Sequence, residues 1–175
     1  MQLRQIKLDF APEQDRLLLR ISTSDGKEVL LWLTRRCVKM MWPVMVRMVE
    51  SSPRVQLAAA SPEARAALLG MEHERAIRGA DFSKPYQEEA LDHPLGADPL
   101  LVTKLQTRRE ENGGHVLTLL PTKGQGVHLT LDESLLHSFC RLLQNAVAKA
   151  EWDFKLEFPV APLTQPAESG QPTLN

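Results

Sequence analysis

Two adjacent arginines stand where the chain is expected to enter a helix. Thr34 is a good N-cap residue, and Arg35 and Arg36 follow it in the first turn. Cations there face the positive end of the helix dipole, which costs about 0.3 to 1 kcal/mol at an exposed position. Two guanidinium groups beside free backbone N–H groups could bind phosphate or carboxylate. The sequence thus predicts an anion site, with an ion pair to Asp132 or Glu133, or solvated arginines that cover apolar surface, as open alternatives.

Four of the six methionines fall in the same expected helix. On a helical wheel its apolar residues leave only a narrow polar strip, which is a wider apolar arc than a surface helix typically needs. Methionine-rich surfaces adapt readily to partners. We therefore expect Met40, Trp42, Met45 and Val46 to bind a partner protein or a second copy of the chain, and filling of the protein's own core is the alternative.

The histidines offer little ready-made chemistry. His73 lies between Glu72 and Glu74 on an expected helix, where it could act as a general base, although a solvated, charged helix face is the simpler interpretation. His115 and His128 fall on adjacent expected strands, about equally far from a turn, so their side chains could approach each other. With a carboxylate of Glu110 or Glu111 they could bind a metal ion. A solvated cross-strand pair is the simpler interpretation, because zinc requires three or four ligands, and we predict no metal site.

No motif of an established catalytic class is present. The chain lacks a Gly-rich phosphate loop, paired-cysteine zinc spacing, a His-Glu-x-x-His helix and a Gly-x-Ser-x-Gly elbow. Cys37 and Cys140 each lie among apolar residues of an expected helix, where a thiol packs as a small hydrophobic group. We predict no catalytic residues and no cofactor, and a small enzyme of an unrecognised class stays as an alternative.

A strand, turn, strand, helix pattern that occurs twice must position these residues. The stretch 15–49 aligns without a gap on 113–147, and Gly26 falls on Gly124 in the two turns. Whether this pseudo-repeat reflects a duplication stays open. The predicted strands cover residues 3–10, 17–21, 28–33, 100–109, 115–120, 127–131 and 152–158, and the predicted helices cover 35–50, 61–78 and 133–151.

Three local patterns add detail to these elements. Pro43 lies inside the first helix and predicts a kink or a break there. Leu30 and Trp32 make the second face of their strand apolar, so we expect another segment to cover it. His137 and Gln144 are expected to point away from the apolar face of the last helix.

The predicted fold class is α+β, with two β-meander plus helix units, mainly antiparallel sheet and helices packed on it. A single domain covers residues 1–158, in which unit one takes about 1–51, a connecting helix and linker about 52–99 and unit two about 100–158. The stretch 159–175 is expected to be a disordered tail. One continuous sheet and two packed sheets are both compatible with this scheme.

Composition argues against strong nucleic-acid binding. The chain of 175 residues has 21 basic and 22 acidic side chains, so it lacks the positive field of most nucleic-acid-binding proteins. The N-terminal segment has no continuous apolar core of a secretory signal, and no apolar run approaches the roughly 18 residues of a membrane span. We therefore expect a cytoplasmic protein whose partner is another protein or a second copy.

The stretch DRLLLRISTSDGKEVLLWLTRRCVKMMWP resembles the N-terminal portion of an uncharacterised family of small bacterial proteins. The resemblance covers about the first third of the chain and rests on the pattern of a hairpin followed by a helix. It implies a bacterial, cytoplasmic protein and brings no activity, cofactor or site residue with it. The function that the sequence favours is a non-enzymatic interaction or accessory protein, with weak anion or nucleic-acid-phosphate binding at Thr34–Arg36 as the first alternative.

Overall fold

The computed structural model describes residues 3–58, 61–80, 85–87 and 91–159. Apart from Pro159, the tail expected over 159–175 lies outside the described residues. In chain order the elements are β1 (Leu3–Ala11), β2 (Arg16–Thr23), β3 (Glu28–Leu33), α1 (Arg35–Glu50), α2 (Pro53–Ala58), α3 (Pro62–Gly79), β4 (Leu100–Arg109), β5 (His115–Pro121), β6 (Val127–Leu131) and α4 (Glu133–Ala150).

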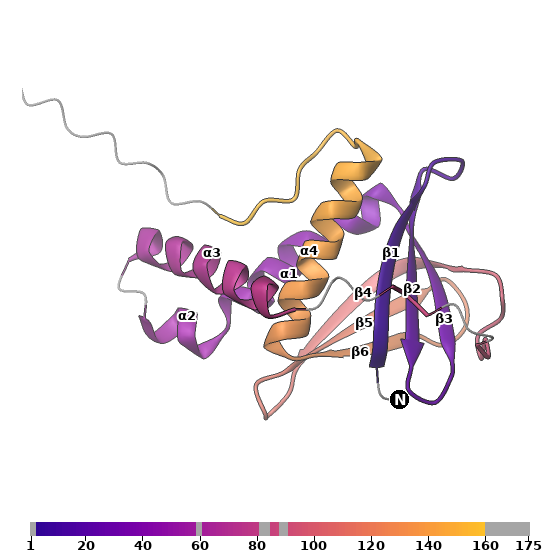
Figure 1. The fold of residues 1–175 in the computed structure, drawn as a ribbon, viewed down its shortest axis with the longest axis horizontal. Helices are drawn as coiled ribbons and strands as arrows, with labels where there is room; N and C mark the ends of the chain where they lie inside the picture. Colours follow the sequence, from indigo (N-terminus) through magenta and orange to yellow (C-terminus); the bar gives the residue numbers. More distant parts are fainter. Residues whose placement is uncertain (1–2, 59–60, 81–84, 88–90, 160–175) are drawn as a thin grey trace, which may run out of the picture.

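The six strands form one sheet, with neighbours in the order of the sequence from β1 to β6 (Figure 1). Four neighbouring pairs are antiparallel, and β3 pairs with β4 in parallel through Leu31 with Leu100 and Trp32 with Leu101. A parallel pair requires a long connection, and the chain supplies one through α1, α2 and α3. The predicted α+β class with a mainly antiparallel sheet is confirmed. Of the two arrangements that the sequence left open, the strands form one continuous sheet.

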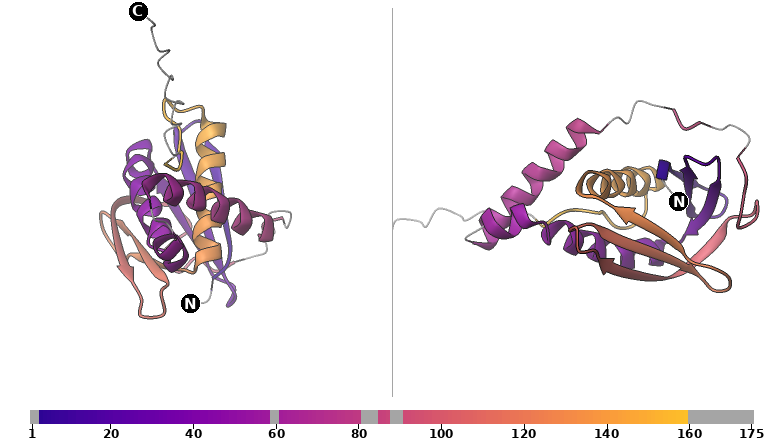
Figure 2. Two further views of the ribbon diagram at one scale, coloured as in Figure 1. Left: turned by 90° about the vertical axis from the view of Figure 1, so that its left-hand side faces the viewer. Right: turned by 90° about the horizontal axis from the view of Figure 1, so that it is seen from below.

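Helices α1 and α4 lie together on one face of this sheet, and each contacts a strand of the other unit. Helix α4 packs beside β1, and α1 packs beside β4. The sheet bends around the helices, so that α4 also contacts β6 at the opposite edge (Figure 2). Side chains of both units, among them Leu19, Met41, Leu117 and Phe139, therefore share one hydrophobic core.

Local signals begin and end these elements as the sequence predicts. Gly26 and Gly124, in the two equivalent turns, have φ angles of +75° and +95°, which suit glycine. Thr34 accepts the N–H of Cys37 at the start of α1, as predicted for an N-cap. Of the kink or break expected at Pro43, the break does not occur, because α1 continues through Pro43 as one helix from Arg35 to Glu50. The kink stays a prediction.

Helices α2 and α3 project from the body of the protein beside α4, and we call them the α2–α3 arm (Figure 1). Helix α3 was predicted, whereas α2 was not. Only Leu69 and His73 of the 18 residues of α3 are buried. An ordinary surface helix buries a continuous apolar stripe, so α3 is unusually exposed for its length.

Residues Tyr86 and His93, from the linker that follows α3, bind the β2–β3 hairpin at Glu28. The buried carboxylate of Glu28 accepts hydrogen bonds from Tyr86 (2.6 Å) and Arg20 (2.9 Å) and contacts His93 Nε2 at 3.0 Å. Tyr86 also lies under the Arg20 guanidinium, 4.7 Å from it. Linker residues thus cover part of this hairpin, around Glu28.

The final strand predicted over 152–158 is not formed, because this segment pairs with no strand of the described sheet. Its side chains do alternate: Trp152 and Leu156 are buried, whereas Asp153 and Lys155 are exposed. The segment packs on helices, which produces the same alternation as a half-buried strand.

Candidate functional site

One arginine of the candidate anion site, Arg35, is already paired with two aspartates. Arg35 Nε lies 3.1 Å from a carboxylate oxygen of Asp15, and Nη1 lies 3.5 Å from one of Asp153. Trp152 supports this arrangement, because its indole N–H donates to Asp15 at 2.7 Å and its ring lies 5.7 Å from the guanidinium. Arg35 therefore forms an ion pair, as one alternative held, but not with the predicted partners Asp132 or Glu133. Arg36 is exposed.

The expected partner surface on α1 is largely core. Trp42, Met45 and Val46 are 8, 0 and 9% exposed, and only Met40, at 43%, is accessible. The segment after α4 closes this side of α1, since Trp42 Nε1 donates to the carbonyl of Glu157 at 3.0 Å. The wide apolar arc is therefore used by α4, β4 and this segment within one molecule.

Two histidines that were expected on polar helix faces meet in the buried contact between α3 and α4. His73 is 4% and His137 is 1% exposed, and their Nδ1 atoms lie 3.0 Å apart. At this distance the Nδ1–H of one imidazole can donate to the Nδ1 of the other. The accepting imidazole must be neutral, so the two rings cannot both be protonated. The position expected for His137 is wrong, because α3 packs against that side of α4.

The environment of this pair favours the neutral forms. Burial, together with the neighbouring His137 and Arg141, lowers the pKa of His73 to about 4. Burial also lowers the pKa of His137, although Glu133 and Glu72 oppose the change. His137 also lines a small cavity of about 370 Å³ together with Glu72 and Glu133. Because each imidazole is buried and its Nδ1 is engaged by the other ring, the pair fits a structural contact better than a general base.

The other candidate groups are also separated or inert. His115 contacts Ser51 at 3.2 Å and His128 contacts Thr118 at 2.8 Å, on opposite faces of the sheet, so the expected approach of the two histidines does not occur. Burial raises the pKa of Cys37 to about 11. In the described part of the chain, no group of three or more His, Cys, Asp or Glu side chains is placed to hold a metal ion.

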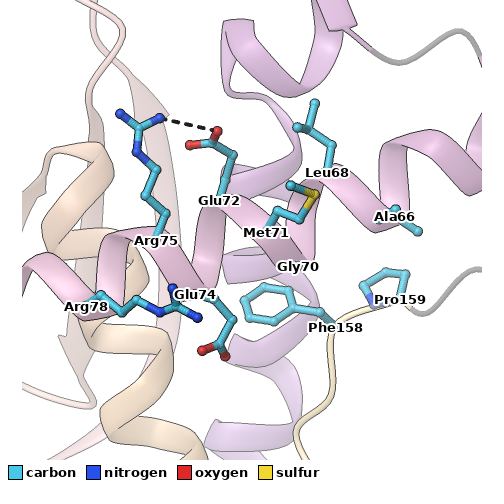
Figure 3. Close-up of a pocket in the computed structure, with 11 residues that line it drawn as sticks. Ala66, Leu68, Gly70, Met71, Glu72, Glu74, Arg75, Arg78, Phe158 and Pro159 are labelled. Atoms are coloured by element: carbon cyan, nitrogen blue, oxygen red, sulfur yellow. Dashed lines mark ion pairs between the residues drawn. The ribbon is translucent and has the colours of Figure 1, made fainter.

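The described residues also form a groove along α3, which we call the α3 groove. It has a volume of about 1010 Å³ and lies between α3 and the end of the segment after α4 (Figure 3). Leu68, Met71 and Phe158 surround Gly70, and the charged side chains stand at the rim. The lining residues are Ala66, Ala67, Leu68, Gly70, Met71, Glu72, Glu74, Arg75, Arg78, Phe158 and Pro159.

The α2–α3 arm also carries the most exposed large apolar side chains of the described residues. Leu57 of α2 is 88% and Met71 of α3 is 69% exposed. Glu72 connects the two helices of the arm through Arg54 at 3.6 Å, and Arg141 of α4 holds Glu74 at 3.3 Å. Polar contacts and the buried side chains of Leu69 and His73 thus fix the arm to the body. Among the described residues, none covers Leu57 and Met71 on its outer side. No sequence pattern had indicated this exposed surface.

Comparison with known proteins adds no family: no family model, no curated protein and no solved structure matches this chain. None of the described helices is long and apolar enough to cross a membrane.

Proposed function

We propose that this protein is a non-enzymatic interaction protein and that it binds its partner in the α3 groove. The observation that carries the proposal is the exposure of α3, an 18-residue helix with two buried residues and an apolar groove along its length. Exposed apolar surface of this kind marks interaction sites in soluble proteins. The location moves from α1, where the sequence had indicated it, to α3.

The shape of the groove favours a helix as the bound element. Amphipathic helices bind in apolar grooves through side chains spaced three, four and seven residues apart. Ala67 and Gly70, two of the smallest residues, line the α3 groove, so the backbone of a partner helix can approach α3 closely there. Charged residues at the rim, such as Arg75 and Arg78, can fix its orientation.

Contacts of the titratable groups support a non-enzymatic role over the enzyme alternative. Glu28 is engaged by Arg20, Tyr86 and His93, and His73 by His137. An active site needs such groups to converge on a pocket that can hold substrate. The lining of the α3 groove is mainly apolar, and of its charged groups Glu72 pairs with Arg75 and Arg54.

Phosphate binding at Thr34–Arg36 stays a weaker alternative, since Asp15 and Asp153 would compete with the anion for Arg35. A cytoplasmic location and a bacterial source, as expected from the sequence, belong to the same proposal.

The proposal can be tested with helical peptides selected for binding to the wild-type protein from a random amphipathic library. We expect selected peptides to lose at least about tenfold in affinity for Met71→Glu, because a carboxylate in the groove must be desolvated. Met40→Glu is the matched control, since Met40 is an exposed methionine on a different helix.

Fluorescence anisotropy with labelled peptides measures both affinities. Equal binding to wild-type and Met71→Glu protein, or loss with the Met40→Glu control instead, would contradict a partner site in the α3 groove.

A further inference from the structure

We infer that the partner in the α3 groove is a second copy of this chain, and that two α3 helices pair antiparallel about a two-fold axis between Gly70 and Met71. The inference rests on the proposed function and names its partner. It is argued from the register that two such helices must adopt and from the side chains that this register brings together.

Complete overlap determines where the axis falls. Helix α3 runs from Pro62 to Gly79, so an antiparallel copy that overlaps its full length has its two-fold axis between Gly70 and Met71. Met71 of one copy then lies over the partner's Gly70, and the same contact recurs on the other side of the axis. An isologous interface requires this kind of self-complementarity.

Gly70 leaves room for that methionine. A Cβ atom built on Gly70 would have no neighbour within 4 Å, so the space above it is open. Met71 is 69% exposed and flexible, and it can enter such a space without rearrangement of the core. Gly70 and Met71 lie about 100° apart around the helix, and both line the α3 groove, so one position offers space and the next a side chain to fill the partner's space.

Charges at the two ends of α3 agree with the same register. Glu63 lies one heptad before Gly70, and Arg78 lies one heptad after Met71. Antiparallel overlap therefore places Glu63 beside the partner's Arg78 at both ends of the pair. Both side chains are exposed. A parallel arrangement would bring Glu63 to Glu63 and Arg78 to Arg78, so the charges favour the antiparallel pair.

The rest of the facing surface tolerates the contact. Ala67 faces the partner's Glu74 in this register, and Glu74 is already paired with Arg141 of its own α4 at 3.3 Å. Ala64 is exposed and small, which allows the helix axes to approach to about 8–10 Å. The projection of the arm in Figure 1 keeps the sheet away from the contact.

The size of the contact predicts weak association. One helix face buries less than the roughly 800 Å² per partner of a standard interface. We therefore expect a dimer with a dissociation constant on the order of 10 µM, populated at the protein concentrations of sedimentation and NMR experiments.

Charge reversal with rescue tests the register. Sedimentation equilibrium of the wild-type protein between about 1 and 200 µM should give a monomer–dimer equilibrium. Glu63→Arg and Arg78→Glu should each weaken dimerisation about tenfold, and the protein with both changes should regain it, because each new arginine again faces a glutamate. Glu111→Arg, in an exposed turn of unit two, is the matched control.

Gly70→Leu gives an independent test that preserves the fold. A Cβ atom at Gly70 meets open space within the monomer, and the leucine side chain can extend into the α3 groove and raise helix propensity. It fills the space that the partner's Met71 would occupy. It should abolish dimerisation while the circular dichroism spectrum and the thermal midpoint of the monomer are retained.

Two results would overturn the inference: a monomer throughout the concentration range, or a double charge variant that dimerises no better than the single variants. Peptide binding separates this failure from failure of the proposed function. If the protein is monomeric but selected helical peptides still depend on Met71, the groove binds a different protein and only the self-association is wrong. If neither dimerisation nor peptide binding depends on Met71, both proposals fail.

Discussion

His73 and His137 attach α3 to α4 through buried imidazoles whose Nδ1 atoms lie 3.0 Å apart. Glu72 and Glu74 flank His73, and this charged context suggests a solvated helix face. The structure instead buries the imidazole at 4% exposure, because the adjacent carboxylates point to either side of it and bind Arg54 and Arg141. The sequence contains no signal for this pair, since its members are 64 positions apart.

Acid should weaken the attachment of α3 to α4. The pKa of His73 is lowered from 6.5 to about 4 by burial, so its contribution to stability is complete above pH 6.5 and is lost as the pH falls through 4. Thermal midpoints of His73→Phe and wild-type protein should therefore change in parallel above pH 6.5, and the wild type should lose more stability between pH 6.5 and 4.

Imidazole NMR titration checks the same point directly. A His73 that protonates at its ordinary pKa without loss of the native spectrum would refute this prediction.

Glu28 is the other residue whose replacement should have a large effect. Burial alone would raise its pKa, but the hydrogen bonds from Tyr86, Arg20 and His93 outweigh it and hold the pKa below its usual value. Glu28→Ala leaves the partly buried Arg20 without this carboxylate and releases the linker, so it should reduce the free energy of unfolding by about 3 kcal/mol.

Urea denaturation measures this change. Glu111→Ala, an exposed carboxylate in a turn, is the control and should leave the midpoint unaltered. A Glu28→Ala protein as stable as that control would show that the cluster does not fasten the linker.

At the scale of elements, the sequence predicts the starts of helices and turns, which depend on residues close in the chain. It does not predict contacts between residues that are far apart in the chain. The turn at Asp25 and Gly26 and the N-caps Thr34 and Asp132 act over a few residues, and the elements they start were predicted closely. The hydrogen bond from Trp42 to the carbonyl of Glu157 joins residues that are 115 positions apart. The segment around Glu157 covers Trp42, so the surface that was expected to bind a partner is part of the core. Local periodicity cannot show which element will cover an apolar arc.

Loss of that cover should be measurable at Phe158. Its ring lies 5.1 Å from that of Trp42 and 4.4 Å from that of His73. Because Phe158 is half-buried, Phe158→Ala should cost about 1 to 2 kcal/mol of unfolding free energy and shift tryptophan emission to longer wavelength. Lys155→Ala, an exposed position in the same segment, is the control. An unchanged emission maximum would mean that the segment does not shield Trp42.

At the scale of the whole molecule, the two units complete each other. Helix α4 packs on β1 and α1 packs on β4, so the two similar units share one core and leave little apolar surface on the body. The α2–α3 arm is the exception, because it does not pack on the sheet and its side chains Leu57 and Met71 are exposed. The candidate site therefore lies in the connection between unit one and unit two, outside both stretches that the sequence pattern aligns.

The most direct test of an association surface on α3 is the methyl NMR signal of Met71 as the protein concentration rises from about 5 to 500 µM, a range that spans weak dimerisation. Met40, an exposed methionine on α1, serves as the internal control in the same spectrum. We expect the Met71 signal to shift or broaden with concentration, or on addition of a selected helical peptide, while the Met40 signal stays in place. A Met71 signal that is unchanged under both conditions would contradict the account.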